Sequence, residues 1–266
     1  MGADIKSLRI RIRSVNSTLH LTRAMGLVAS SKIRRATQNM NRSREYTEAL
    51  EDVVSRLRSA PECAKSPYMT ALGTGTRLIV IAGDRGLAGG YNANVFRLAA
   101  TEETEKVIPI GKRACDRFGG GYASAEHFSA EDARKLAEEL CQGFQAGEFG
   151  RLGILYTRYQ SIMTQTAEIR WVLPLTAEAG EKDTPTVFEP DEQTVLDAAV
   201  PAYVAGMLAA CVRESFASEV AARRMAMDSA GKNAQEMIDR LQLQYNRARQ
   251  NTITQEITEI VAGSGL

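Results

Sequence analysis

Hydrophobic and small residues near the amino end of the chain recur at steps of three and four. The repeat continues over about seven heptads, which predicts a helix wound left-handedly around a partner helix. Its members are Ile5, Leu8, Ile12, Val15, Leu19, Thr22, Gly26, Ala29, Ile33, Ala36, Met40, Ser43, Thr47, Leu50, Val54 and Leu57. Large side chains fill both ends of this seam, whereas Thr22, Gly26 and Ala29 narrow it midway and allow a closer approach.

A second long helix is expected near the carboxyl end, over residues 206–262, which are rich in good helix formers. Its apolar seam has a looser register and is read as Met227, Ala230, Ala234, Met237, Leu241, Tyr245, Ala248 and Thr252. Ile253, Ile257 and Ile260 extend the apolar stripe toward the terminus. Because no third helix of similar length is present, we expect the two long helices to pair with each other.

The positions of the prolines separate these end segments from the middle of the chain. None of the seven prolines lies in residues 1–60 or 202–266. Since proline interrupts helix interiors, the ends can be continuous helices and the middle cannot. The expected parts are a helix at 1–58, a linker at 59–76, an α/β domain at 77–200 and a helix at 201–266.

The middle of the chain alternates between strand-like and helix-like segments. Expected strands are 77–82, 106–110, 152–159 and 167–175, and expected helices are 92–105, a segment from Lys112, and 129–144. Ser129 and Asp132 have the spacing of a capping box at the start of the last of these helices. The alternation predicts an α/β, Rossmann-like domain with a mostly parallel sheet and helices on its faces.

Composition and charge exclude several classes of protein. The 266-residue chain has a net charge of +1, so the molecule as a whole has no strong attraction to nucleic acid or membrane. No uninterrupted run approaches the roughly 18 apolar residues of a membrane span, and the amino end lacks a secretory signal. Four separated cysteines and two isolated histidines favour no metal site, and we expect neither a cofactor nor a catalytic residue.

A glycine-rich stretch, Gly83–Gly90, follows the first strand and invites comparison with nucleotide-binding loops. It matches neither GxGxxG nor the P-loop pattern, and no acidic residue closes the next strand to hold a ribose. A structural turn or a contact with another subunit is favoured over nucleotide binding. In the contact interpretation, Asp84 and Arg85 are the charged tips of the loop.

The first helix is strongly basic. Residues 1–44 contain ten Lys or Arg residues and one acid, Asp4. Scattered charges of this kind usually form a solvated face, but Arg23 and the group Lys32, Arg34 and Arg35 flank the narrow part of the seam. No aromatic residues interleave with them, which disfavours nucleic acid. An acidic membrane surface and acidic protein segments both stay open as partners of this basic helix.

Both end segments closely resemble the gamma subunit of the F-type rotary ATP synthase. The resemblance rests on Leu21–Arg34 in the first helix and on Arg224–Ala230 and Leu241–Gly263 in the last. The central Asp84–Gly90 stretch is also similar to the family pattern. Together with the order helix, α/β, helix, the resemblance covers nearly the whole chain.

The resemblance implies a central-stalk rotor subunit of a bacterial enzyme, non-catalytic by itself, whose terminal helices form an antiparallel coiled coil. Implied partners are the alpha and beta subunits of the catalytic hexamer, the epsilon subunit and the membrane c-ring. The implied location is peripheral, on the cytoplasmic side of the plasma membrane, with the membrane reached only through partners. The residues matched to beta-subunit contacts are Arg249, Gln250, Met25 and, more weakly, Thr254, and the basic residues Arg23, Lys32, Arg34 and Arg35 are implied to face beta.

Two other classes stay open on the residues alone. One is a coiled-coil scaffold whose α/β domain binds a ligand, and the other is an enzyme built on the middle domain. Co-purification separates them from the rotor subunit, which is expected once per three alpha–beta pairs.

Overall fold

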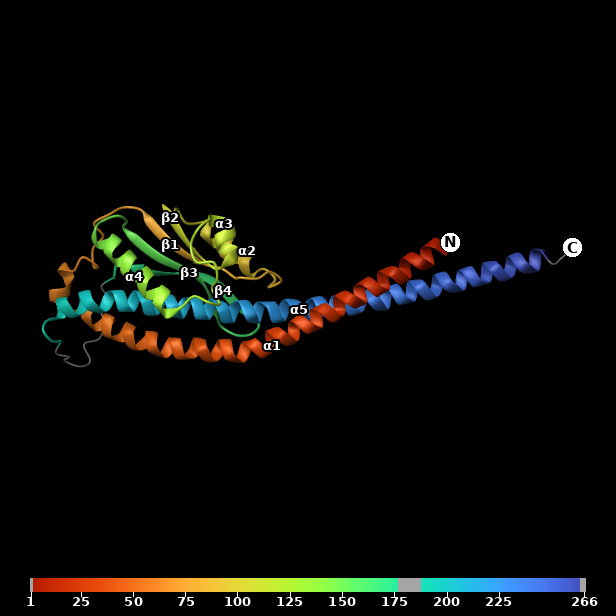
Figure 1. Ribbon diagram of the computed structural model, residues 1–266, viewed down its shortest axis with the longest axis horizontal. Coiled ribbons are helices and arrows are strands. Elements are labelled where there is room, and N and C mark those ends of the chain that lie inside the picture. The colour runs from red at the N-terminus through yellow and green to blue at the C-terminus, as the bar shows by residue number, and fades with distance from the viewer. Residues whose placement is uncertain (1, 177–187, 264–266) are drawn as a thin grey trace. The chain divides into compact units, whose positions relative to one another are not determined.

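A computed structural model describes residues 2–176 and 188–263 of the chain, with side chains from Ile5 onward. Its two longest elements are helices α1 (Gly2–Arg58) and α5 (Glu192–Gly263). They lie side by side and antiparallel (Figure 1). The contacts between them run in opposite directions along the sequence, from Arg9 with Tyr245 to Arg23 with Gln235.

The chain divides into two compact units. The first, called here the coiled-coil unit, contains the described residues up to Ala29 and from Arg223 onward. The second, called the α/β unit, contains residues from Ser30 to Ala222, including the remainder of both long helices.

The seam expected along α1 is confirmed. Each of its positions from Ile5 to Leu57 is buried or half-buried, whereas most intervening residues are exposed. The polar members Thr22, Ser43 and Thr47 are buried as well, and their hydroxyls donate to backbone carbonyls three or four residues earlier. This local bonding explains how hydroxyl groups are tolerated in a helix seam.

The seam expected along α5 is wrong in register at two positions. Met237 is 44 % exposed, and its neighbour Ile238 is buried with Leu19 and Ala234. With Ile238 in the seam and half-buried Gly231 preceding Ala234, the spacing becomes a regular alternation of four and three. The looser register expected from the sequence came from choosing Met237 in place of Ile238 and Ala230 in place of Gly231.

A four-stranded sheet forms the centre of the α/β unit. Its strands are β1 (Thr76–Ile81), β2 (Lys106–Ile110), β3 (Arg151–Tyr159) and β4 (Gln165–Leu173), in the order β2-β1-β3-β4. The first three pair in parallel, and β4 joins β3 as an antiparallel hairpin. The mostly parallel α/β sheet expected from the sequence is therefore confirmed.

Helices cover both faces of this sheet. On one face, α2 (Tyr91–Ala99) and α3 (Lys112–Phe118) pack on strand residues such as Leu78, Val80 and Leu155. On the other, α4 (Ala130–Gln145) joins parts of α1 and α5 in the main core, which includes Phe144 and Phe149. The arrangement is a three-layer sandwich within this unit, and α2 and α3 are seen together in Figure 1.

Local sequence signals predict the start of one helix correctly and that of another incorrectly. Ser129 and Asp132 form the expected capping box at α4, with reciprocal bonds of 3.0 and 2.9 Å. By contrast, α5 begins at Glu192, ahead of the proline that was expected to precede it, and Pro201 lies inside the helix. Asp191 accepts hydrogen bonds from the amide and hydroxyl of Thr194, and burial of residues such as Val200 offsets the cost of a proline in a helix.

The segment expected to be a linker packs closely against the α/β unit. It contains a short 3-10 helix, η1 (Pro61–Lys65), and the buried side chains of Cys63 and Tyr68. The Leu175 amide donates to the Tyr68 carbonyl at 2.8 Å.

By length and composition alone, one stretch of α5 is apolar enough to cross a membrane. The sequence contains no uninterrupted apolar run of that length, so this stretch also includes polar residues. Half of that stretch is buried inside the chain. Leu196, Val204 and Leu208 of α5 belong to the main core, so the apolar character of this helix reflects its packing against the sheet.

Candidate functional site

The coiled-coil unit has its closest helix approach at small residues. A side-chain carbon added at Gly26 would lie 3.7 Å from the Cβ of Met227, and one added at Gly231 would lie 3.6 Å from the Thr22 hydroxyl. Further along the seam, Leu19 packs against Ala234 and Ile238. Small residues therefore bring the helix backbones together, as the narrow seam in the sequence predicted.

An apolar outer surface accompanies this narrow region. Leu21, Leu27 and Val28 of α1 are each more than half exposed. Met25 is half-buried next to Gly26, so part of its side chain remains accessible to another molecule. Large exposed apolar side chains grouped over two helical turns are typical of a protein contact surface.

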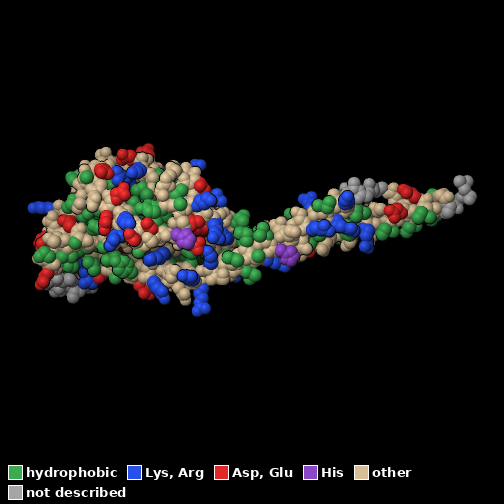
Figure 2. Space-filling model, viewed as in Figure 1, with side chains coloured by type: hydrophobic (Ala, Val, Ile, Leu, Met, Phe, Trp, Pro, Cys, Tyr) green, Lys and Arg blue, Asp and Glu red, His purple; other side chains and the backbone are tan. Residues whose placement is uncertain are grey.

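The carboxyl part of α5 also presents an exposed surface. Arg249 and Gln250 are exposed and Thr254 is exposed one turn further on. Ile253, Ile257 and Ile260 are 44–69 % exposed at steps of four and three, so they form a stripe on one helix face. Figure 2 shows hydrophobic side chains, in green, along this end of the helix.

Polar contacts join the two helices of the coiled-coil unit. Arg9 donates to the Tyr245 hydroxyl at 2.8 Å, and its guanidinium carbon lies 5.7 Å from the Tyr245 ring centroid. The hydrogen bond to Arg9 lowers the pKa of Tyr245. Arg23, expected to belong to a basic contact face, donates instead to Gln235 at 3.4 Å and remains exposed.

The other expected basic residues lie in the α/β unit and differ from one another. Lys32 donates to Glu126 at 2.7 Å and lies 6.0 Å from the ring centroid of Phe216. Arg34 and Arg35 are exposed. Lys32 is thus partly engaged within the chain, whereas the guanidinium groups of its neighbours remain accessible.

Asp84 in the glycine-rich loop turns into the fold. Its two carboxylate oxygens accept hydrogen bonds at 2.6–3.2 Å from the Ser124 hydroxyl and the amides of Lys112, Ala125 and Glu126. Partial burial acts to raise the pKa of Asp84, but these hydrogen bonds outweigh it and hold the pKa below its usual value. Asp84 therefore links its own glycine-rich loop to the start of α3 and to the loop that contains Ser124.

The glycines of this region allow close packing. Gly111 has a φ of +96°, and a side chain there would collide with the Ala82 carbonyl. A side-chain carbon at Gly83 would lie 2.7 Å from Glu219 of α5. Arg85, the other charged residue of the loop, is exposed. The loop is thus a packed strand-to-helix turn whose outer side presents Arg85.

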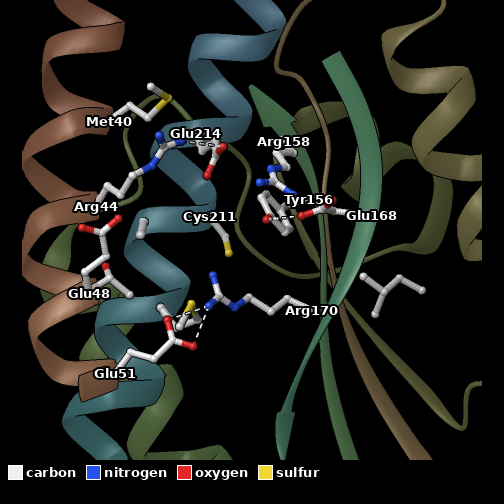
Figure 3. Close-up of a pocket in the computed structure, with 14 residues that line it drawn as sticks. Met40, Arg44, Glu48, Glu51, Tyr156, Arg158, Glu168, Arg170, Cys211 and Glu214 are labelled. Carbon is white, nitrogen blue, oxygen red and sulfur yellow. Dashed lines mark hydrogen bonds and ion pairs between the residues drawn. The ribbon is translucent and has the colours of Figure 1, made fainter. Parts of the chain in front are cut away.

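A charged cavity of about 580 Å³ lies where the sheet faces the two long helices within the α/β unit (Figure 3). Arg170 of β4 donates from one nitrogen to both carboxylate oxygens of Glu51 on α1, at 2.9 and 2.8 Å. Arg44 of α1 donates to Glu214 of α5 at 3.1 Å. The first contact joins the sheet to α1, and the second joins α1 to α5 beside the cavity.

Tyr156 and Cys211 also line this cavity. Burial raises the pKa of Tyr156, and the hydrogen bond that its hydroxyl donates to Glu168 raises it further. Burial likewise raises the pKa of the Cys211 thiol, which keeps it protonated near neutral pH. No sequence pattern indicates this cavity, because its residues come from four elements that are distant along the chain.

Within residues 2–176 and 188–263, no three potential metal-ligating side chains are grouped closely enough to hold an ion. The candidate site is accordingly a set of surfaces: the apolar turns around Met25, the exposed end of α5, and the basic residues of α1.

Fold and surfaces together define a class of proteins in which two long, paired terminal helices flank an α/β domain. A family model described as ATP synthase matches residues 4–265. The ATP synthase gamma chain of Ruminococcus albus is 39 % identical over 280 residues and covers 98 % of each chain. The chain belongs to the family of ATP synthase gamma chains.

Other relatives and solved structures agree with this. The sodium ion specific ATP synthase gamma chain of Acetobacterium woodii is 35 % identical over 99 % of both chains. A chain in the structure of the Euglena gracilis mitochondrial ATP synthase (OSCP, F1 and c-ring) matches with a TM-score of 0.68 at 18 % identity, covering 99 % of this chain and 94 % of that one. At this identity, the structural match supports the fold.

Proposed function

We propose that the chain is the central-stalk rotor subunit of a bacterial F-type ATP synthase, without catalytic activity of its own. In this role it transmits torque from ion flow through a membrane ring to the catalytic sites of the beta subunits, and in reverse during hydrolysis. Family membership over nearly the whole chain supports the proposal.

The observation that carries the proposal is the close antiparallel pairing of α1 and α5 inside the coiled-coil unit. Their seam is filled by residues such as Leu19, Ala234 and Ile238, and polar bonds from Arg9 and Arg23 link its flanks. A paired helix resists bending and unwinding better than a single one. An asymmetric shaft cannot contact the three beta subunits in the same way. Each rotational position therefore favours a different open or closed conformation of each catalytic site, because the shaft binds those conformations with different affinity.

Exposed residues of this unit supply the proposed contacts with beta. Arg249, Gln250 and Thr254 are exposed on α5, and Met25 is half-exposed on α1. The basic residues Arg23, Lys32, Arg34 and Arg35 are proposed to meet acidic segments of beta, and Asp84 and Arg85 to mark a subunit-contact loop. Arg85 is exposed and could reach another subunit, which supports the proposed contact. Asp84 instead stabilises the conformation of the loop through its hydrogen bonds.

The proposed partners are the alpha and beta subunits of the catalytic hexamer, the epsilon subunit and the c-ring. The proposed location is the cytoplasmic face of the plasma membrane, reached only through those partners. Solved structures with the same fold come from F1/c-ring and central stalk/c-ring assemblies of mitochondrial ATP synthases, which supports this assignment.

Co-purification tests the proposal. The tagged chain, expressed in its own cells, should bring down alpha and beta subunits at one copy per three alpha–beta pairs, measured by quantitative mass spectrometry. The isolated chain should hydrolyse no ATP, whereas the captured assembly should. Recovery without alpha and beta, or ATP hydrolysis by the isolated chain, would refute the rotor assignment.

A further inference from the structure

A second cavity, called here the basic cavity, lies within the α/β unit and has a volume of about 540 Å³. It is formed by α1, α5 and the loop that precedes α4. The residues that matter for its chemistry are Lys32, Arg35, His127, Phe128, Arg213 and Phe216. A volume of this size is in the range of cavities that hold small molecules in proteins.

Positive charge is in excess in this cavity. Lys32, Arg35 and Arg213 line it together with one acid, Glu126, whose carboxylate is bonded to Lys32 at 2.7 Å. Over the part of the chain that the structure describes, neither Arg35 nor Arg213 is paired with a carboxylate. Arg213 is held in place by a 2.5 Å hydrogen bond from its Nη1 to the Ser43 hydroxyl. Two guanidinium groups are therefore left to attract an anion.

Two aromatic side chains line the basic cavity beside its charged groups. Phe216 comes from α5, and Phe128 comes from the loop before α4. Phe128 packs edge-to-face against Tyr122, with ring centroids 4.9 Å apart, which fixes its ring. Asp84 holds the same loop by accepting hydrogen bonds from the amides of Ala125 and Glu126. Phe128 is thus held in position without a ligand.

We propose that the basic cavity binds a small phosphate ester with a planar or apolar body, such as a nucleoside monophosphate. Arg35 and Arg213 would hold the phosphate, because guanidinium groups match the geometry and charge of phosphate oxygens. Phe128 and Phe216 would contact the body of the ligand. Phosphate monoesters carry nearly two negative charges at neutral pH, which matches the excess charge of the cavity.

An acidic protein segment is the competing occupant, and two features favour the small molecule. Lys32 already has a carboxylate partner inside the chain, so it offers less to an external acidic side chain. The aromatic walls would contact nothing in a chain of aspartates and glutamates, whereas they match a planar ring. This inference goes beyond the stalk role and does not depend on it; it assigns Lys32 and Arg35 to the ligand of the cavity in place of the acidic segment of beta proposed above.

Isothermal titration calorimetry of the purified full-length chain tests the assignment, with AMP, adenosine and inorganic phosphate as probes. AMP should bind with a Kd below about 1 mM, and phosphate and adenosine should each bind at least about tenfold more weakly. Arg35→Ala and Arg213→Ala should each weaken AMP binding about tenfold, as expected for loss of a charged hydrogen bond. Phe216→Ala should weaken binding of AMP and leave that of phosphate unchanged.

Arg34→Ala is the matched control, because Arg34 is a neighbouring exposed arginine outside the cavity lining. It should bind AMP like the unmodified chain, and circular dichroism should show equal helix content in every variant. Absence of saturable binding up to about 10 mM AMP, or equal effects of the three arginine variants, would overturn the proposal. Equal affinity for phosphate and AMP would overturn the role given to the aromatic walls.

Displacement of AMP by a hexaglutamate peptide at lower concentration than by phosphate would assign the cavity to an acidic protein segment instead. Because the isolated chain is used, these results are independent of its assembly into a larger complex.

Discussion

Gly26 on α1 faces Met227 on α5 so closely that a single added carbon at Gly26 would lie 3.7 Å from the Met227 Cβ. That distance is ordinary contact between carbon atoms, so the space holds one methyl group and no more. The contact lies next to Met25 and within two turns of the exposed side chains of Leu21 and Leu27. Seam packing and the proposed contact surface are therefore coupled through the same helix turns.

Enlarging Gly26 should destabilise the coiled-coil unit. Gly26→Leu adds three carbons beyond the available space and should lower the free energy of unfolding by about 1–3 kcal/mol, the usual cost of overpacking. Urea denaturation followed by circular dichroism measures this.

Gly26→Ala is the matched control for that variant. Its methyl group fits, and alanine in a helix interior is about 0.5–1 kcal/mol better than glycine, so stability should rise. A Leu variant as stable as the Ala variant would show that the helices separate freely at this turn.

Replacing Asp84 by asparagine should change the dependence of stability on pH. Because the folded-state pKa of Asp84 is below its unfolded value, its contribution is present above pH about 4 and is lost as pH falls through the folded pKa. Asp84→Asn should lose about 1–3 kcal/mol at pH 7, from lost charge-assisted hydrogen bonds. It should also lose less additional stability than the unmodified chain between pH 5 and pH 3.

Asp116→Asn controls for the change of charge, since Asp116 is exposed and its ion pair with Arg113 is 3.8 Å long. Stability of this variant should match that of the unmodified chain at pH 7. If the pH profile of Asp84→Asn coincides with that of the unmodified chain, the loop-organising role of Asp84 is incorrect.

The contact between Arg170 and Glu51 should contribute modestly to joining β4 and α1. Both side chains are more than a third exposed, so a double-mutant cycle with Arg170→Met and Glu51→Gln should give a coupling energy of about 0.5–1 kcal/mol. The exposed pair Lys135 and Glu131 provides the comparison and should couple more weakly. Equal coupling in the two cycles would mean that the cavity confers no added strength on its ion pair.

Arg249 should matter for function without mattering for folding. If it contacts beta, Arg249→Ala should lower the rate of coupled ATP synthesis in inverted membrane vesicles about tenfold, the effect of losing roughly 1.4 kcal/mol of interaction. Arg247→Ala removes an equally exposed arginine two residues away and should retain normal rates. Thermal unfolding of both isolated variants should match that of the unmodified chain. Normal synthesis with Arg249→Ala would contradict the assigned contact.

Much of the fold could be predicted because it depends on local patterns. The seam of α1 follows from steps of three and four, and the cap at Ser129 follows from its spacing to Asp132. The exceptions occurred where two local signals competed. Met237 and Ile238 are adjacent apolar residues, and only contact with Leu19 decides which of them is buried. Pro201 argued for a later start of α5, and the packing of residues around it overrode that preference.

The candidate surfaces were harder to predict because they depend on contacts between distant residues. Nothing near Lys32 in the sequence indicates that Glu126 would neutralise it. Asp84 looked like an exposed tip because its hydrogen-bond donors lie up to 42 residues further along the chain. The exposure of Arg249 and Gln250, by contrast, could be predicted from helical periodicity. The same periodicity places Tyr245 in the seam, where it is half-buried, and these two residues outside it.

The unequal lengths of the two paired helices have a mechanical consequence. In the register of Arg9 and Tyr245, the described part of α1 pairs with α5 as far as about Thr252, and the described side chains of α5 after that residue are exposed. A lone helix has a radius of about 5–6 Å, roughly half of the ~10 Å half-width of a helix pair. In the proposed rotor, friction against a surrounding partner would act through this radius as a lever arm, so the same sliding force would oppose turning about half as strongly at the exposed end. In the proposed role, the exposed end of α5 would therefore contribute less resistance to turning than the paired part of the same helix.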